Sequence, residues 1–292
     1  MKLVTFTTAN STRIGAIVDD KLIDFSLAAP TLPTNMKSFL CGGNDAMAVA
    51  EASLGNTGAA IKLDEVRLEA PILNPGKMLA IGLNYADHVA ESGMEMPKHQ
   101  IWFNKQWNSV LGPDQNVDIP SVAPDFIDYE AEMCFVIGRT CRHVPVDRAH
   151  EVIAGYTCGN DVSVRDWQLR TPQFTIGKSF ETHGPIGPWI VTADEFGNPH
   201  NKSIKCFINE EKRQDSNTEH LIFNCFEQVA HLSAAFTLNP GDVIFSGTPS
   251  GVGGAMKPGQ FLKNGDVMRI EIDGIGSLTN TCVDKQAETI ID

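Results

Sequence analysis

The chain has 292 residues, of which 42 % are apolar and 20 % charged. This composition is typical of a folded protein with one large core, or with a core and a small appended domain. The 23 basic and 36 acidic residues give a net charge of −13. Such a balance disfavours nucleic acid and anionic membranes as partners. An anionic small ligand would need a bound cation or a few well-placed basic side chains.

The sequence carries no export or membrane signal of the usual kind. Polar residues between Asn10 and Arg13 interrupt the first twenty residues, and no run of about 18 consecutive apolar residues occurs. The seven cysteines are odd in number and widely spread, without a Cys-x-x-Cys pair. They are predicted to be reduced thiols, mostly buried. We therefore expect a cytoplasmic protein.

The first part of the chain predicts a small α/β domain. Strand-like runs cover Lys2–Thr7, Ile14–Val18 and Leu22–Phe25, and a helical pattern follows over Met36–Leu54. The Pro- and Gly-rich stretch Ala70–Gly76 is typical of a linker. The expected boundaries are residues 1–72 for this domain and 73–292 for the main domain.

The main domain is predicted to be α+β and mainly β. Short β-branched runs alternate with Gly, Pro, Asn and Asp clusters, and only two segments, Val146–Ile153 and Phe223–Phe236, favour a helix. The strand-like runs are Met78–Gly82, Glu130–Gly138, Ile186–Val191, Ile204–Ile208, Val243–Ser246 and Val267–Ile272.

Two carboxylates share one face of a predicted strand. The alternation of Glu130–Gly138 places Glu130 and Glu132 on one side, while Met133, Phe135 and Ile137 point to the other. Neighbouring carboxylates repel each other unless a cation or a proton lies between them. Taken alone, the pair is also compatible with a solvent-exposed strand edge.

A third acid, Asp161, ends the strand-like segment Gly155–Asp161. Three carboxylates without a nearby His or Cys would form an oxygen site for Mg²⁺, Mn²⁺ or Ca²⁺. Its open positions could take the two oxygens of an α-keto carboxylate, which would also solve the charge problem of an anionic ligand. Cys134 is predicted on the same face of the strand as the two glutamates. It could simply pack in the core, or it could act as a nucleophile or as a ligand of a soft metal.

Six segments resemble the fumarylacetoacetate hydrolase family. The resemblance implies a β-roll, that is, a mixed and mostly β fold with a rolled sheet, and a homodimer. It also implies a Mg²⁺ or Mn²⁺ ion held by Glu130, Glu132 and Asp161. The segments are Gly82–Glu91, Phe103–Pro113, Asp128–Glu132, Gly159–Gln168, Gly177–Pro185 and Pro240–Gly253.

By the same resemblance, His88 and Glu91 form a catalytic pair on a short helical lid and activate water. Residues three apart on a helix are neighbours, so Glu91 can orient His88 as a general base. Without the other motifs, a surface pair is the simpler interpretation. Lys178 matches a lysine that faces the metal and would stabilise a carboxylate or an enolate.

The resemblance also suggests substrate contacts. Arg165 and Gln168 match a segment that lines the pocket, Thr248 lies on a Gly-rich turn near the substrate, and Tyr85 belongs to the first motif. That turn lacks the Gly-Lys-Ser/Thr ending of a phosphate-binding loop. The wall beside Lys178 departs from the family pattern at His183, which leaves a substrate contact by this side chain open.

These observations predict metal-dependent hydrolysis of a carbon–carbon bond in a 2,4-diketo acid of the acylpyruvate type. The same enolate chemistry also serves oxaloacetate decarboxylases, tautomerases and isomerases of unsaturated keto diacids, which remain alternatives, as does a non-catalytic metal-binding relative. Only the side chains Met94, Met96, Trp102 and Trp107 hint at the tail, in favour of an apolar or aromatic acyl group.

Overall fold

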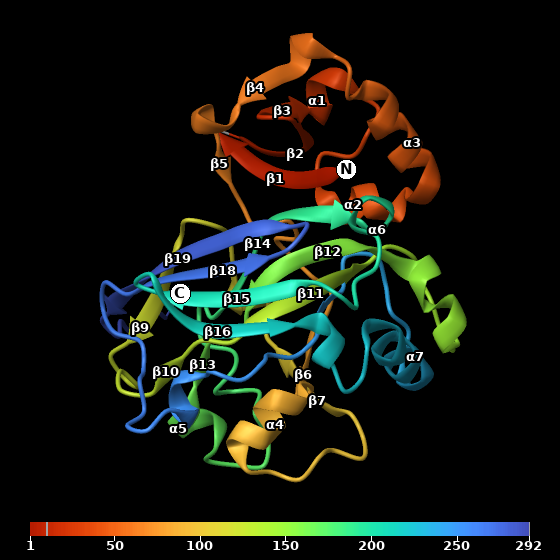
Figure 1. The fold of residues 1–292 in the computed structure, drawn as a ribbon. Coiled ribbons are helices and arrows are strands. Elements are labelled where there is room, and N and C mark those ends of the chain that lie inside the picture. Colours follow the sequence, from red (N-terminus) through yellow and green to blue (C-terminus); the bar gives the residue numbers. More distant parts are fainter. Residues whose placement is uncertain (10, 292) are drawn as a thin grey trace.

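The structure is a computed structural model that describes residues 1–9 and 11–291. Within these residues the strands form one sheet of twelve strands, one of five and one of two (Figure 1). The helices are short and lie at the margins of the sheets. The predicted α+β, mainly β architecture is therefore confirmed.

The three sheets have the following strands. The large sheet has the main order β4 (Ala60–Lys62), β3 (Lys21–Asp24), β2 (Ser11–Val18), β1 (Lys2–Thr8), β14 (Gly184–Thr192), β12 (Ile153–Asn160), β11 (Ala131–Ile137), β17 (Val243–Phe245), β6 (Met78–Gly82) and β7 (Ile101–Lys105), with β5 (Arg67–Leu68) on β1 and β8 (Val110–Leu111) on β14. The second sheet has the order β16 (Glu211–Asn217), β15 (Ser203–Ile208), β18 (Val267–Ile272), β19 (Gly276–Lys285) and β9 (Asn116–Pro120). The short ladder joins β10 (Ile127–Asp128) to β13 (Ser163–Val164).

The described helices fall into two groups, α-helices and 3₁₀ turns. The α-helices are α1 (Phe25–Ala28), α2 (Met36–Cys41), α3 (Gly43–Ser53), α4 (Ala86–Ser92), α5 (Arg165–Gln168), α6 (Ala193–Phe196) and α7 (Cys225–Ala235). The 3₁₀ turns are η1 (Thr57–Ala59), η2 (Leu63–Glu65), η3 (Trp107–Ser109), η4 (Val146–Val152), η5 (Thr218–His220) and η6 (Gly253–Ala255). Within the described part of the chain, no helix is long and apolar enough to cross a membrane.

The N-terminal strands continue the sheet of the main domain. Strand β1 pairs antiparallel with β14, with Lys2 opposite Val191 and Leu3 opposite Ile190. One buried cluster contains Leu3 and Phe39 from the N-terminal part together with residues of β11 and β17. The two parts thus share both a sheet and a core, and the boundary at residue 72 stays a prediction.

Strand β11 runs through the middle of the molecule and carries the site. Its residues Met133, Phe135 and Ile137 pack into one core cluster, and Cys134 and Val136 pack into another. This division confirms the predicted alternation, because successive side chains of a strand point to opposite faces. Glu132 lies on β11 and Glu130 directly precedes it, and both are buried, so they are not the exposed edge pair that was the alternative interpretation.

The predicted helices agree with the structure in part. The pattern over Met36–Leu54 is divided into α2 and α3, because Gly43 has φ +56°, a left-handed conformation that favours glycine and ends the first helix. Helix α7 is confirmed, and Asn224 and Glu227 form a capping box at its start. The segment predicted as the helix Val146–Ile153 is the 3₁₀ stretch η4 instead.

Candidate active site

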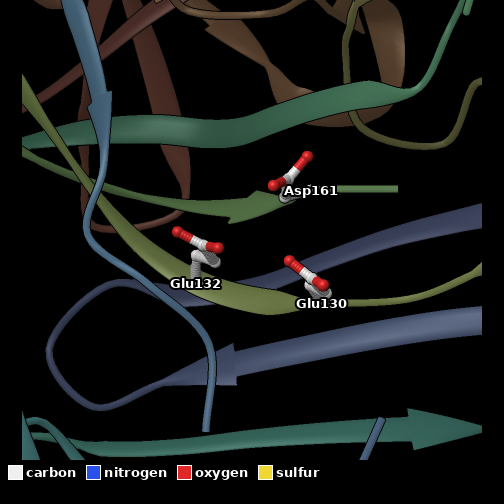
Figure 2. Close-up of side chains that lie close together, drawn as sticks. All are labelled: Glu130, Glu132 and Asp161. Carbon is white, nitrogen blue, oxygen red and sulfur yellow. The ribbon is translucent and has the colours of Figure 1, made fainter. Parts of the chain in front are cut away.

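Glu130, Glu132 and Asp161 point into one shared space (Figure 2). One oxygen from each carboxylate lies within 4.8 Å of the others, and the side chains are buried. The pairing of β11 with β12 creates this geometry, since Ala131 lies opposite Asn160 and the Asp161 amide donates to the Glu130 carbonyl over 3.0 Å. The register thus brings Asp161 beside residues some thirty positions earlier in the chain.

Two buried lysines neutralise part of this negative charge. Lys178 Nζ donates to Glu130 Oε2 and to Asp161 Oδ2, each over 2.8 Å. Lys105 Nζ donates to the other oxygen of Asp161 over 2.6 Å and also to the backbone carbonyl of Lys178. Asp161 is therefore held by two cations, one on each oxygen.

Arg165 connects the cluster to a fourth acid. Its Nη1 lies 2.7 Å from Glu130 Oε1, and its Nε donates to Asp128 Oδ2 over 2.9 Å. Asp128 also accepts from the amides of Gly253 and Gly254 over 2.7 and 2.8 Å. Arg165 and Asp128 thus fix the Gly-rich turn against the carboxylates.

The pKa values of the two glutamates of the cluster are shifted in opposite directions. Burial by itself raises the pKa of Glu130, but Lys178 and Arg165 outweigh it and lower this pKa to about 2. For Glu132, burial raises the pKa well above its usual value, and the charges of Asp161 and Glu130 raise it further. Within the described part of the chain, its hydrogen-bond partner is the Gly247 amide, which donates to Oε2 over 2.6 Å. Glu132 is the carboxylate that lacks a direct cation.

These residues fit a divalent metal ion. Three buried carboxylates converge, and the raised pKa of Glu132 means that the protein without a metal favours a proton where a cation would remove the repulsion. An all-oxygen donor set suits Mg²⁺ or Mn²⁺ better than a soft metal. Glu130, Glu132 and Asp161 would hold the ion.

His88 and Glu91 lie together on helix α4. His88 Nδ1 is 3.4 Å from Glu91 Oε2, and both oxygens of Glu91 accept from the Gly251 amide over 3.0 Å. Gly251 has φ +100°, and an added Cβ would lie 2.0 Å from the Arg213 carbonyl, so glycine is required here. The Gly-rich turn therefore positions the helix that carries the pair.

One cavity of about 820 Å³ joins these groups. His88, Glu91, Glu130, Lys178 and Arg165 all line it. Two of the predicted substrate contacts, Gln168 and Thr248, line it as well. Thr248 Oγ1 donates to the Ala131 carbonyl over 2.9 Å, and Arg165 Nη1 donates to Gln168 Oε1 over the same distance. The His88–Glu91 pair, Glu130 of the carboxylate cluster and two buried cations thus face one space.

Three other candidates lie away from this space. Tyr85 is fully buried and lies outside the set of residues that line the cavity in the described structure. Cys134 is buried, and burial raises the pKa of its thiol well above the usual value, which favours packing over nucleophilic chemistry. His183 is buried, its Nε2 lies 2.7 Å from the Asp118 carbonyl, and burial lowers its pKa to about 4. His183 thus contacts backbone rather than the cavity.

Sequence reasoning missed Lys105 and Asp128 as members of the site. Both stand inside motifs that were recognised, Phe103–Pro113 and Asp128–Glu132. A lysine or aspartate is normally solvated, so burial was the missing signal. The two side chains are 2 % and 0 % exposed. Buried charges require partners, which here are Asp161 and Arg165.

Convergent buried acids, bases and cations around a cavity are the features of an enzyme active site. The model of the fumarylacetoacetate (FAA) hydrolase C-terminal family matches residues 77–283. The chain belongs to the fumarylacetoacetate hydrolase family, and the resemblance predicted from the sequence is confirmed. It is an enzyme by this membership and by the retained site.

Three similar proteins illustrate the activities named among the relatives of this chain. It is 40 % identical to oxaloacetate tautomerase fahd2, mitochondrial, of Xenopus laevis, over 97 % of this chain and 90 % of the relative. It is similar to the maleylpyruvate hydrolase of Sphingobium sp. SYK-6 in complex with manganese(II) and pyruvate, with 32 % identity, a TM-score of 0.82 and coverage of 98 % and 100 %. A third, the 5-carboxymethyl-2-hydroxymuconate delta-isomerase of Mycobacterium smegmatis, has 34 % identity, a TM-score of 0.78 and coverage of 98 % and 99 %.

Proposed function

We propose that the enzyme hydrolyses a carbon–carbon bond in a 2,4-diketo acid of the acylpyruvate type and depends on Mg²⁺ or Mn²⁺. One observation carries this proposal: the His88–Glu91 pair lines the same cavity as Glu130, Lys178 and Arg165. A base that can activate water thus faces the cations that would stabilise the leaving enolate. The related maleylpyruvate hydrolase, whose structure contains manganese and pyruvate, supports this assignment.

The ion would be held by Glu130, Glu132 and Asp161, and it would supply positive charge that polarises the carboxylate and 2-oxo oxygens of the substrate. Lys178 adds a fixed cation beside this cluster. Arg165, Gln168 and Thr248, which line the cavity, would contact the substrate. Tyr85, also expected as a substrate contact, is buried and lies outside the described lining of the cavity.

The chemical step uses His88 as a general base. His88 removes a proton from a water molecule, and the water oxygen bonds to the 4-carbonyl carbon. The bond between C3 and C4 then breaks, its electron pair stays with C3, and a carboxylic acid and the enolate of pyruvate result. Protonation at C3 completes the reaction. Glu91 orients the imidazole and balances its positive charge, while Lys178 lowers the energy of the enolate.

Tautomerisation of oxaloacetate is a second candidate, because the frog relative is named for that activity. The same pair could move a proton at C3 without any attack by water. Decarboxylation of oxaloacetate and isomerisation of an unsaturated keto diacid also pass through an enolate, and the isomerase of Mycobacterium smegmatis keeps the latter open.

The deciding experiment uses metal-stripped protein with Mg²⁺ or Mn²⁺ added back. Acetylpyruvate and oxaloacetate are the substrates, and acetate, pyruvate, carbon dioxide and the enol absorbance of oxaloacetate are followed. Release of acetate that depends on metal supports the hydrolase. Loss of the enol signal without release of acetate or carbon dioxide would favour tautomerisation of oxaloacetate instead. Metal binding without turnover of any keto acid would favour a non-catalytic relative.

We also propose a homodimer and a cytoplasmic location. The homodimer rests on the family resemblance, and sedimentation of the purified protein tests it. The location is the one expected from seven free cysteines, which suit a reducing compartment, whereas the frog relative is named mitochondrial. Fractionation of cells that express the full chain decides between the two compartments.

A further inference from the structure

Two aromatic pairs form walls of the active-site cavity. The rings of Phe103 and Phe174 meet edge to face at 5.9 Å, and those of Phe126 and Phe261 do so at 5.1 Å. All four residues line the cavity. They come from four separate segments of the chain, so the fold alone gathers them. The other apolar residues of the lining are Ile81, Leu83, Met94, Ile101, Leu169, Val252 and Ala255.

These walls begin beside the polar cluster. Lys178 Nζ lies 5.0 Å from the centre of the Phe103 ring. On the other side, the Arg165 amide donates to the Phe126 carbonyl over 2.9 Å. A keto acid anchored near Lys178 and Arg165 would therefore direct its far end between the two aromatic pairs.

Several apolar side chains of these walls are exposed to solvent. Phe126, Met94 and Leu169 are 44 %, 58 % and 71 % exposed. Large apolar side chains that line a concave site gain free energy when a ligand removes them from water. Besides Lys178 and Arg165, the cavity is lined by the charged residues Glu91, Glu130, Asp166 and Lys257, and Asp166 is paired with Arg170.

The size of the cavity agrees with a larger ligand. Sites for drug-sized molecules measure roughly 300 to 1,000 Å³, and this cavity of about 820 Å³ lies in the upper part of that range. Acetylpyruvate and oxaloacetate are much smaller than such molecules. Either would leave most of the apolar lining in contact with water.

We infer that the site is built for 2-oxo acids with a long apolar or aromatic acyl tail. The tail lies between the ring pair of Phe103 and Phe174 and the ring pair of Phe126 and Phe261. This inference rests on the proposed function for the position of the keto acid. It also corrects the hint taken from the sequence: Met94 lines the cavity, but Met96, Trp102 and Trp107 lie outside the lining residues of the described structure.

The test measures binding, not turnover. Manganese-loaded protein is titrated by calorimetry with 2-oxobutanoate, 2-oxohexanoate, 2-oxooctanoate and 4-phenyl-2-oxobutanoate, which lack the 4-carbonyl and cannot be hydrolysed. Affinity is expected to rise about fourfold for each added methylene group. Equal affinity along the series, or no binding by any of these acids, overturns the inference.

Variants locate the tail. Phe126→Ala and Phe261→Ala are each expected to lower the affinity ratio of 4-phenyl-2-oxobutanoate to 2-oxobutanoate by about tenfold, and Phe261→Leu should restore part of it. Trp107→Ala is the matched control, because Trp107 is 67 % exposed and lies outside the lining. An unchanged ratio in both alanine variants would refute the placement.

A dicarboxylate is the competing occupant, with its second carboxylate on Lys257. Tighter binding of 2-oxoadipate than of 2-oxohexanoate, lost in Lys257→Met, would overturn the apolar tail. The binding series tests the apolar tail, whereas the acetate assay tests the hydrolase activity, so the two hypotheses can be refuted independently. A retained chain-length trend without acetate release would remove the hydrolase and keep the tail, whereas acetate release without a trend would do the reverse.

Discussion

Glu130 and Glu132 lie two residues apart on the same face, yet replacing each by glutamine should change the stability of the metal-free protein in opposite directions. Glu130 is ionised and paired with Lys178 and Arg165 at 2.8 and 2.7 Å. Removing one partner of a buried ion pair costs about 3 to 5 kcal/mol. We expect the lower end for Glu130→Gln, because Lys178 retains Asp161 and Arg165 retains Asp128.

Glu132→Gln should behave differently. The raised pKa of Glu132 means that the folded metal-free protein holds a proton which the unfolded chain releases above about pH 4.3. The contribution of Glu132 to the free energy of unfolding of the wild type is therefore full below that pH and is lost as the pH rises. Glutamine mimics the protonated acid at every pH. Glu132→Gln should thus be more stable than wild type, and the difference should be larger at pH 8 than at pH 5.

Thermal unfolding in EDTA measures both effects. At roughly 2 to 4 °C per kcal/mol for a chain of this size class, Glu130→Gln should lower the Tm by about 6 to 12 °C. Wild type with metal at a hundred times its Kd should gain about 2.7 kcal/mol, and both variants should lose most of that gain. Equal destabilisation by the two variants in EDTA would refute the reasoning, because Glu132 would then be ionised and paired.

Three other variants test separate parts of the site. His88→Asn should lower kcat for acetylpyruvate by about 10² to 10⁴ while Mn²⁺ binding measured by electron paramagnetic resonance is kept; a parallel loss of metal would contradict the role of a base. Lys105→Met should destabilise the protein by about 3 to 5 kcal/mol in urea unfolding, because Asp161 keeps only one of its two lysines, and a change below about 1 kcal/mol would show that the pair is weak. His183 has a pKa of about 4 in the folded protein, below its unfolded value of about 6.5, so stability is full above pH 6.5 and about 3 kcal/mol is lost as the pH falls to 4. His183→Gln should remove this loss from the stability profile, and an unchanged profile would show that His183 is not its source.

Much of the site could be predicted from local sequence. The alternation of Glu130–Gly138 determines which side chains share a face of β11, and the structure confirms it. The spacing of His88 and Glu91 determines their contact on α4. Helix α7 begins at a capping box that is encoded within four residues. In each case the interacting groups are close in the chain, so short-range geometry is sufficient.

Other elements were not visible in the sequence. Strand β16 (Glu211–Asn217) is entirely polar, and only Gln214 in it is buried. It forms at the edge of the second sheet, where β15 is its partner. The predicted helix Val146–Ile153 is the 3₁₀ stretch η4 instead. Secondary structure that depends on a neighbour cannot be read from propensity.

The sequence by itself determined the family, the mainly β composition and the residue types of the site, because motifs and strand alternation are local properties. Only the tertiary structure decided that β1 extends the main sheet through β14, that Lys105 reaches Asp161, and that four phenylalanines from separate segments meet around one cavity. These contacts join residues far apart in the chain. Their energies come from burial and from charge pairing in a desolvated interior, and neither exists until the sheet has closed.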